Sequence, residues 1–134
     1  MPDPVDYSTP EGVMTPIGPY SHIAKAGNLI MISATAGVDP ATGKLAGPDV
    51  ASQTTQIIRS FDHMLKSVGA DLAHILHVTV YLKDMADFAA MNAAYEKAFG
   101  ALRPARSAVA VSDLPKPGAR VTMNLTAVTP AKEP

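Results

Sequence analysis

The apolar residues between positions 49 and 68 recur at helical intervals. They stand at Val50, Ile57, Ile58, Phe61, Leu65 and Val68. This spacing puts the apolar side chains on one side, so it predicts a helix with one buried face. Asp49 can cap the start of this helix and Gly69 can end it. The same spacing recurs at Phe88, Met91, Tyr95 and Phe99. We expect Asp84 to cap this second helix and Gly100 to stop it.

Strands are predicted on both sides of these helices. Two short runs, Tyr20–Ala26 and Leu29–Thr35, flank Gly27-Asn28, whose tolerance of positive φ favours a tight hairpin turn. Residues 39–43 form a second turn. Alternation with a period of two predicts three further strands, over residues 76–83, 106–111 and 121–127. Residues 112–118 contain two prolines and a glycine, so they cannot continue a strand.

The resulting order is two strands, a helix, a strand, a helix and two strands. It predicts one α+β domain whose helices pack on a single face of a sheet. On the opposite face we expect Arg106, Ala108, Ala110, Thr122, Asn124 and Thr126. A sheet surface that meets water usually carries more lysine and glutamate, and small side chains let another surface come close. The pattern therefore predicts that another subunit covers this face.

Composition bounds the class of protein. The chain has 134 residues, of which 47% are hydrophobic and 17% charged, and this excludes disorder and is typical of one folded domain. We divide it into an extended arm over residues 1–15, where prolines oppose regular structure, a domain over 16–129 and a short tail over 130–134. No apolar run reaches the roughly 20 residues of a membrane span, and the acidic N-terminus lacks the features of a signal peptide. A cytoplasmic protein with no membrane partner is therefore expected.

Charge and metal-ligand content exclude further classes. The net charge is −1 and no basic stripe is present, which argues against a nucleic-acid partner bound through its phosphates. The chain has no cysteine, so it has no thiolate metal site. His74 and His77 are expected to point to opposite faces of one strand, so they cannot chelate one metal. No glycine-rich phosphate loop is present. We expect no metal and no cofactor.

Three polar residues stand where chemistry is possible. Arg106 begins a predicted strand, and a guanidinium on an enclosed sheet face needs an anion, either a ligand carboxylate or an acidic side chain of the protein. Tyr20 follows Gly18-Pro19, where its phenol could orient a ligand or its ring could simply pack. Asn92 interrupts the apolar stripe of the second helix, so it needs partners in a ligand or in a neighbouring backbone.

Five segments carry a resemblance to a known family: Ile17-Gly18-Pro19-Tyr20, Asp39-Pro40-Ala41-Thr42-Gly43, Val80-Tyr81-Leu82-Lys83-Asp84, Met91-Asn92-Ala93-Ala94-Tyr95 and Pro104-Ala105-Arg106-Ser107. From Ile17 to Val128 the chain resembles the RidA/YjgF enamine/imine deaminase family, which older usage calls the L-PSP endoribonuclease family. The resemblance implies a chorismate-mutase-like α+β fold with a mixed sheet. It also implies a homotrimer whose sheets line a central barrel, with ligand clefts between the subunits.

The resemblance also implies an activity. Active members hydrolyse 2-imino acids, which pyridoxal-phosphate enzymes release, to 2-keto acids and ammonia, and they need no metal or organic cofactor. The family arginine that clamps the substrate carboxylate falls on Arg106, the family tyrosine on Tyr20 and the helix asparagine on Asn92. Ser107 follows the arginine in the motif and belongs to the expected substrate site.

The chain departs from the family pattern at three positions. Thr122 stands where the family has a glutamate that positions or activates water, and a threonine hydroxyl is no useful base near pH 7. Ala108 stands where a cysteine is common, and Ala34 replaces the glycine of a usual Ser-Gly pair. We expect Arg106 and Thr122 at the reacting centre and place Ala34 and Ala108 in the substrate site.

Three functions follow as hypotheses. The first is hydrolytic deamination of a small 2-imino or enamino acid, with Arg106 holding the carboxylate. The second is a non-catalytic trimer that binds small carboxylic acids, because the family glutamate is replaced by Thr122. The third is a ribonuclease, which the net charge and the absence of a histidine pair on one face disfavour.

Overall fold

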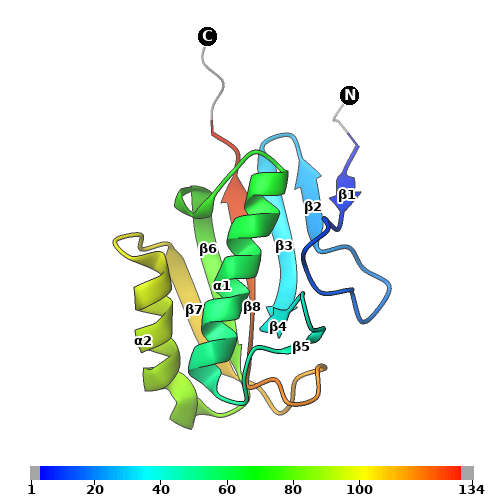
Figure 1. The fold of residues 1–134 in the computed structure, drawn as a ribbon. Helices are drawn as coiled ribbons and strands as arrows, with labels where there is room; N and C mark the ends of the chain where they lie inside the picture. Colours follow the sequence, from blue (N-terminus) through cyan, green and yellow to red (C-terminus); the bar gives the residue numbers. More distant parts are fainter. Residues whose placement is uncertain (1–3, 131–134) are drawn as a thin grey trace.

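The sheet has six strands in the order β1-β2-β3-β8-β6-β7 (Figure 1). The computed structural model describes residues 4–130. The strands of this sheet are β1 (Asp6–Ser8), β2 (Ile23–Ala26), β3 (Leu29–Ala36), β6 (Ile75–Leu82), β7 (Ala105–Ala110) and β8 (Val121–Val128). Only β6 and β7 pair in parallel, because the chain between them crosses over through a helix. The mixed sheet of one α+β domain is thereby confirmed.

Two helices cover one face of the sheet, α1 (Val50–Ser67) and α2 (Phe88–Phe99) (Figure 1). The core lies between this helical layer and the sheet, and its strand residues alternate along β6 and β8. They are Val78, Val80, Leu82, Val121, Met123 and Leu125, all buried. The prediction of two helices on a single face is confirmed. We call this side of the sheet the helix face and the other side the open face.

The ends of the helices follow local chemistry. Asp49 caps α1 by accepting a hydrogen bond from the Ser52 N–H at 3.0 Å, as predicted. Gly100 ends α2 with a φ of 64°. Asp84 does not cap α2: it caps the short 3₁₀ turn Met85–Asp87, which leads directly into that helix. The prediction of Asp84 as the cap of α2 is wrong because an aspartate can cap a 3₁₀ turn as well as an α-helix.

The predicted turns are present. Gly27 has a φ of 59° between β2 and β3, and the turn at residues 39–43 joins two further short strands, β4 (Val38–Asp39) and β5 (Lys44–Leu45). In the expected arm, Asp6–Ser8 pairs with β2 as the edge strand β1. Residues 1–3 of that arm and residues 131–134 of the expected tail lie outside the described part of the chain.

The register of β7 corrects one prediction. Arg106 pairs with Val78 and Ala108 with Val80, and both valines face the helices. Arg106, Ala108 and Ala110 therefore lie on the helix face, whereas we expected them on the opposite one. The physical reason is that a period of two shows which residues share a face but not which face it is.

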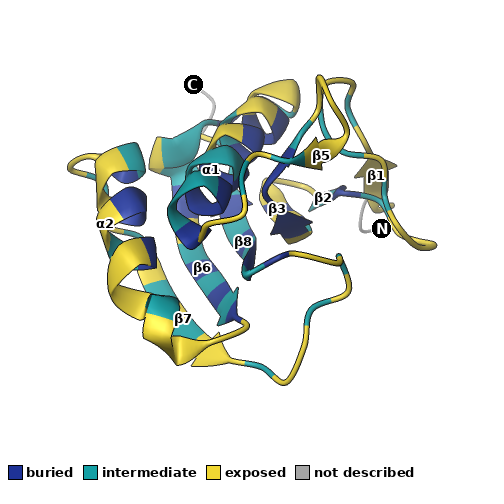
Figure 2. Cartoon of the chain, turned by 60° about the horizontal axis from the view of Figure 1, so that its bottom comes forward, coloured by how far each residue is buried: buried dark blue, intermediate teal, exposed yellow. Residues whose placement is uncertain are grey.

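The open face is built from uncharged residues, as predicted, but of the six residues expected on it only Thr122, Asn124 and Thr126 lie there. On strands β3, β6, β7 and β8 its residues include Leu29, Met31, His77, Thr79, Tyr81, Ser107, Val109, Thr122, Asn124 and Thr126. No aspartate, glutamate, lysine or arginine is among them, and Leu29, Met31 and Val109 are each more than 40% exposed. Figure 2 shows exposed stretches along the edge strand β7. An uncharged sheet surface of this kind is typical of one that meets another protein surface.

A buried glutamine fixes the loop between β7 and β8. Gln53 on α1 is fully buried, donates to the carbonyls of Gly47 (3.0 Å) and Gly118 (3.2 Å), and accepts from the Arg120 N–H at 2.8 Å. Gln53 stands in the apolar stripe of α1, where a buried polar side chain needs hydrogen-bond partners.

We expect Gln53→Met to lower the free energy of unfolding by about 3 kcal/mol or more, since an unpaired buried polar group costs about 1–3 kcal/mol. Urea denaturation measures this change. Gln56→Met is the matched control, because the half-buried Gln56 makes only a 3.4 Å contact with Ser60. Equal stability of the two variants would contradict a role for Gln53 in holding the loop.

Candidate functional site

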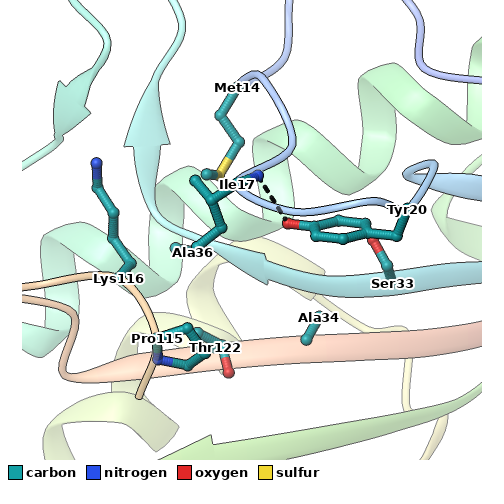
Figure 3. Close-up of a pocket in the computed structure, with 9 residues that line it drawn as sticks. All are labelled: Met14, Ile17, Tyr20, Ser33, Ala34, Ala36, Pro115, Lys116 and Thr122. Carbon is teal, nitrogen blue, oxygen red and sulfur yellow. Dashed lines mark hydrogen bonds between the residues drawn. The ribbon is translucent and has the colours of Figure 1, made fainter.

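A cavity of about 370 Å³ opens at one end of the open face (Figure 3). It is lined by Met14, Ile17, Tyr20, Ser33, Ala34, Ala36, Pro115, Lys116 and Thr122. We call it the Thr122 cavity. Its walls come from the segment before β2, from β3, from β8 and from the loop that precedes β8. Three of the expected site residues, Tyr20, Ala34 and Thr122, therefore meet here.

A β-bulge in β3 shapes this cavity. Ile32 pairs with Leu125 and Thr35 with Met123, so Ser33 and Ala34 together oppose the single residue between those partners. An extra residue of this kind reverses the alternation of faces along the strand. The bulge therefore turns both Ser33 and Ala34 toward the cavity, which explains how adjacent residues of one strand line the same space.

Aromatic and basic side chains complete the walls of the Thr122 cavity. The Tyr20 ring lies over Ser33, and its hydroxyl accepts a hydrogen bond from the Ile17 N–H at 3.4 Å (Figure 3). Among residues 4–130, Lys116 brings the one charged group that lines the cavity. Thr122 is 6% exposed, so its hydroxyl is largely shielded from bulk water.

A second cavity, of about 390 Å³, lies at the edge of the sheet between α2 and β7. Its lining residues are Asn92, Tyr95, Glu96, Arg103, Pro104 and Arg106. We call it the Arg106 cavity. The guanidinium carbon of Arg106 lies 4.8 Å from the centre of the Tyr95 ring and 5.8 Å from that of Phe88. The two rings hold the planar cation in place by cation–π attraction.

The polar groups of the Arg106 cavity are short of partners within the chain. Among residues 4–130, no carboxylate oxygen lies within 4.0 Å of the Arg106 guanidinium, since Glu96 pairs with Arg103 at 3.5 Å instead. The side-chain oxygens of Asn92 and Tyr95 are buried and have no hydrogen-bond partner in the same described range. Burial raises the pKa of Tyr95, and the nearby Arg106 charge opposes that shift. The cavity thus offers the Arg106 cation and the Tyr95 O–H to an anion, whereas the Asn92 side-chain oxygen can accept a hydrogen bond from a donor group of the same ligand.

The structure therefore divides the expected site residues. Tyr20, Ala34 and Thr122 line a cavity on the open face, whereas Asn92 and Arg106 line one on the helix face, and the two cavities share no residue. The remaining two, Ser107 and Ala108, line neither.

Ser107 and Ala108 point to opposite sides of β7. Ser107 is exposed on the open face, where its hydroxyl lies 3.2 Å from His77 Nε2. Ala108 packs against the core beneath α2. Asp113, in the loop before β8, is exposed and paired with Lys83, and Glu96 belongs to the Arg106 cavity. The described part of the chain brings no acidic side chain into the Thr122 cavity.

The described residues also bear on metal binding and on membrane insertion. Within residues 4–130, no group of three or more histidine, aspartate or glutamate side chains is placed to hold a metal ion. None of the helices in this range is both long and apolar enough to cross a membrane.

Sequence reasoning missed several lining residues. Met14 and Lys116 come from irregular segments whose path no periodicity predicts. The spacing assigns Tyr95 only to the apolar stripe of α2, although a tyrosine within such a stripe has a polar tip that needs a partner. His22 lies behind the cavity rather than in its lining, and its burial beside Ser33 follows from the fold alone.

Comparison with known proteins agrees with this architecture. The solved structure of the YjgF gene product of E. coli superposes with a TM-score of 0.85 at 35% identity, and the match covers 92% of this chain and 98% of that one. The fold is thus that of a YjgF-like α+β protein with one mixed sheet and two helices.

Sequence relatives define the family. A family model described as Endoribonuclease L-PSP matches residues 11–129. A RutC family protein of Pyrococcus horikoshii is 46% identical over 106 residues, which are 79% of this chain and 84% of that protein. The human 2-iminobutanoate/2-iminopropanoate deaminase is 36% identical over 112 residues, or 84% of this chain and 81% of its own. The chain belongs to the RidA/YjgF/L-PSP (RutC) family.

Proposed function

We propose that this protein hydrolyses small 2-imino acids to 2-keto acids and ammonia in a cleft formed by two copies of the chain. The Arg106 cavity of one copy binds the substrate carboxylate, and the Thr122 cavity of the next copy encloses the C=N bond. Relatives named as 2-iminobutanoate/2-iminopropanoate deaminases support this substrate class.

The observation that carries the proposal is the state of Arg106. Its guanidinium is half-buried, held by two aromatic rings and without an acidic partner among residues 4–130. An enclosed cation without a counter-ion is unfavourable, so an external anion stabilises it. The planar fork of a guanidinium matches the two oxygens of a carboxylate. A carboxylate-bearing small molecule therefore fits this cavity.

The division of the site supports assembly from two copies. One chain keeps Arg106 on the helix face and Thr122 on the open face, with β6 between their strands. A substrate of a few carbon atoms cannot reach both groups of the same chain through the sheet. The uncharged open face gives a second copy a surface on which to pack. The trimeric barrel with a chorismate-mutase-like arrangement satisfies both requirements.

The chemistry requires water and no cofactor. Arg106 fixes the carboxylate, and this orients the adjacent C=N carbon toward the opposite cavity. Water adds to that carbon, and the carbinolamine then loses ammonia. The Thr122 hydroxyl can hold the water by a hydrogen bond, but it cannot accept a proton near pH 7. An enzyme of this kind acts where imino acids are released, and we expect the cytoplasm as its compartment.

A coupled assay tests the function. 2-Aminoacrylate is generated from serine in situ, and pyruvate and ammonia release is followed with and without this protein. The expected result is faster release than in buffer alone. If the protein binds 2-ketobutyrate but leaves the release rate unchanged, the non-catalytic carboxylate-binding trimer is the correct alternative.

The assembly makes a separate prediction. We expect a mass of about 42 kDa, three times the 14.0 kDa of the chain, by light scattering coupled to gel filtration. Thr126→Arg on the open face is expected to give monomers, since it puts charge into the contact. Ala93→Arg on the exposed side of α2 is the matched control and should stay a trimer. A monomeric wild-type protein at micromolar concentration would contradict the intersubunit cleft.

A further inference from the structure

A buried histidine lies directly behind the Thr122 cavity. His22 is 1% exposed, and both of its ring nitrogens have partners. Nε2 lies 2.7 Å from the carbonyl oxygen of Met14, and Nδ1 lies 3.4 Å from the hydroxyl oxygen of Ser33. Its backbone N–H donates to the Thr9 hydroxyl at 3.1 Å, which ties the residue to the N-terminal arm.

The partners of His22 determine which nitrogen carries the proton in the neutral ring. A carbonyl oxygen can only accept, so the proton of the neutral imidazole is on Nε2. Nδ1 therefore has a free electron pair, and the Ser33 hydroxyl donates to it. Here a serine hydroxyl donates to an imidazole, and the Met14 carbonyl oxygen orients that imidazole. In such an arrangement the histidine can accept the proton of the serine hydroxyl.

Ser33 connects this imidazole to the cavity. It lies in the β-bulge of β3, lines the Thr122 cavity beneath the Tyr20 ring and is half-buried (Figure 3). His22 itself does not line the cavity. A water molecule in the cavity can thus contact the Ser33 hydroxyl, whereas it reaches the His22 ring only through that hydroxyl.

We propose that His22, acting through Ser33, is the proton acceptor for the attacking water, the task that Thr122 cannot perform. This inference rests on the proposed imine hydrolysis. The general base is then His22, and the Ser33 hydroxyl relays the proton to it. Both residues belong to the copy that contributes the Thr122 cavity.

The proton steps balance. As the water oxygen bonds to the carbon of a protonated imine, the C=N electron pair moves to nitrogen. The water proton passes to Ser33 Oγ while the Ser33 proton passes to His22 Nδ1. The carbinolamine is then neutral and His22 is an imidazolium that still donates from Nε2 to Met14. The proton returns through Ser33 to the amine nitrogen, the C–N bond breaks and ammonia leaves. The new carbonyl oxygen gives its proton to solvent.

The charged and titratable groups around His22 leave it free to accept this proton. Tyr20 meets the imidazole edge-on, with ring centres 5.9 Å apart. Lys116 lines the far side of the cavity. Asp6 and Glu11, on the neighbouring β1 and arm segments, are exposed. Within residues 4–130 no carboxylate oxygen lies within 4.0 Å of the His22 ring, so Ser33 and Met14 are its polar contacts.

The test compares pH–rate profiles of imine hydrolysis from pH 5 to 9, each corrected for the uncatalysed rate. We expect the wild-type kcat/KM to rise with pH through a single-proton limb. His22→Gln retains an amide N–H for Met14 but cannot titrate, and Ser33→Ala removes the relay hydroxyl. Each is expected to lower kcat/KM by about 10²-fold and to flatten the limb. The double variant should lose no more than either single one, because both groups serve one path.

His74→Gln is the matched control, because His74 lies in the 3₁₀ turn Leu72–His74 and contacts Asp71. It should keep the wild-type profile. If Ser33→Ala and His22→Gln keep the wild-type limb at full or reduced rate, the histidine is structural and the relay is wrong, although the hydrolase stands. If the wild-type protein does not accelerate imine hydrolysis, the proposed function fails and the relay fails with it. Should His22→Gln not fold, Ser33→Ala decides the outcome alone.

Discussion

In a chain whose His22 is replaced by glutamine, Thr122→Glu is expected to raise kcat/KM for imine hydrolysis by about 10²–10⁴-fold, the range for a general base. The physical reason is that the new carboxylate accepts the water proton that Ser33 and His22 no longer remove. In the wild-type background the same substitution should help much less, because a base is already present. The coupled imine assay measures both rates.

The surroundings of Thr122 favour this result. Ala36 and Tyr81 flank Thr122 on the neighbouring strands, and the small side chains of Ala34 and Ala36 leave room in the cavity for a longer residue. Burial raises the pKa of a carboxyl group, and a nearby cation such as Lys116 lowers it, so a glutamate here remains able to accept a proton. Arg106 of the same chain lies on the other face of the sheet and cannot pair with it.

Thr122→Gln is the matched control, because it has nearly the same shape without a base, and it should leave the rate of the His22→Gln chain unchanged. Equal gains from Thr122→Glu in both backgrounds would show that the two groups act independently, against the relay. Loss of both rate and 2-ketobutyrate binding would show that the glutamate closes the cleft by pairing with the arginine of a neighbouring copy.

Arg106→Ala is expected to abolish the binding of 2-ketobutyrate and to lower kcat/KM by at least about 10²-fold. The wild-type affinity should be roughly millimolar, about 4 kcal/mol, and a charged hydrogen-bonded clamp supplies most of such a small binding energy. Arg106→Lys should also bind weakly, because an ammonium cannot span two carboxylate oxygens and stacks less well on Tyr95 and Phe88. Isothermal titration calorimetry measures the affinities.

The matched control is Arg59→Ala, which removes the same charge from the exposed side of α1. It should bind 2-ketobutyrate as the wild type does. Light scattering on Arg106→Ala checks that the assembly is intact, so that lost binding is not lost structure. Undiminished binding by Arg106→Ala would show that the guanidinium is structural and that the anion site lies elsewhere.

Local interactions explain what the sequence by itself determined. Helix α1 depends on apolar residues three and four positions apart and on the Asp49 cap, which all act within a few residues of one another. The alternation along β8 likewise predicted that Thr122, Asn124 and Thr126 share one face, and the register confirms it. The motif around Arg106 was enough to relate the chain to its family, and the family match agrees.

Interactions between distant segments decided the rest. Arg106 and Ala108 lie on the helix face because β7 pairs in parallel with β6, and the alternation within β7 cannot specify that pairing. The bulge that turns Ser33 toward the cavity exists only in the pairing of β3 with β8. Such contacts join residues far apart in the chain, and their energies depend on the whole packed arrangement rather than on any local pattern.

In the candidate site, too, the sequence determined some features and the tertiary structure the others. Residue types and motif spacing were enough to nominate Arg106, Tyr20, Asn92 and Thr122, since each is an unusual polar or substituted position in its pattern. Only the tertiary structure separated them into two cavities on opposite faces of the sheet. Only burial and hydrogen bonding set His22 behind Ser33, because a histidine acquires a role from the groups that surround its ring.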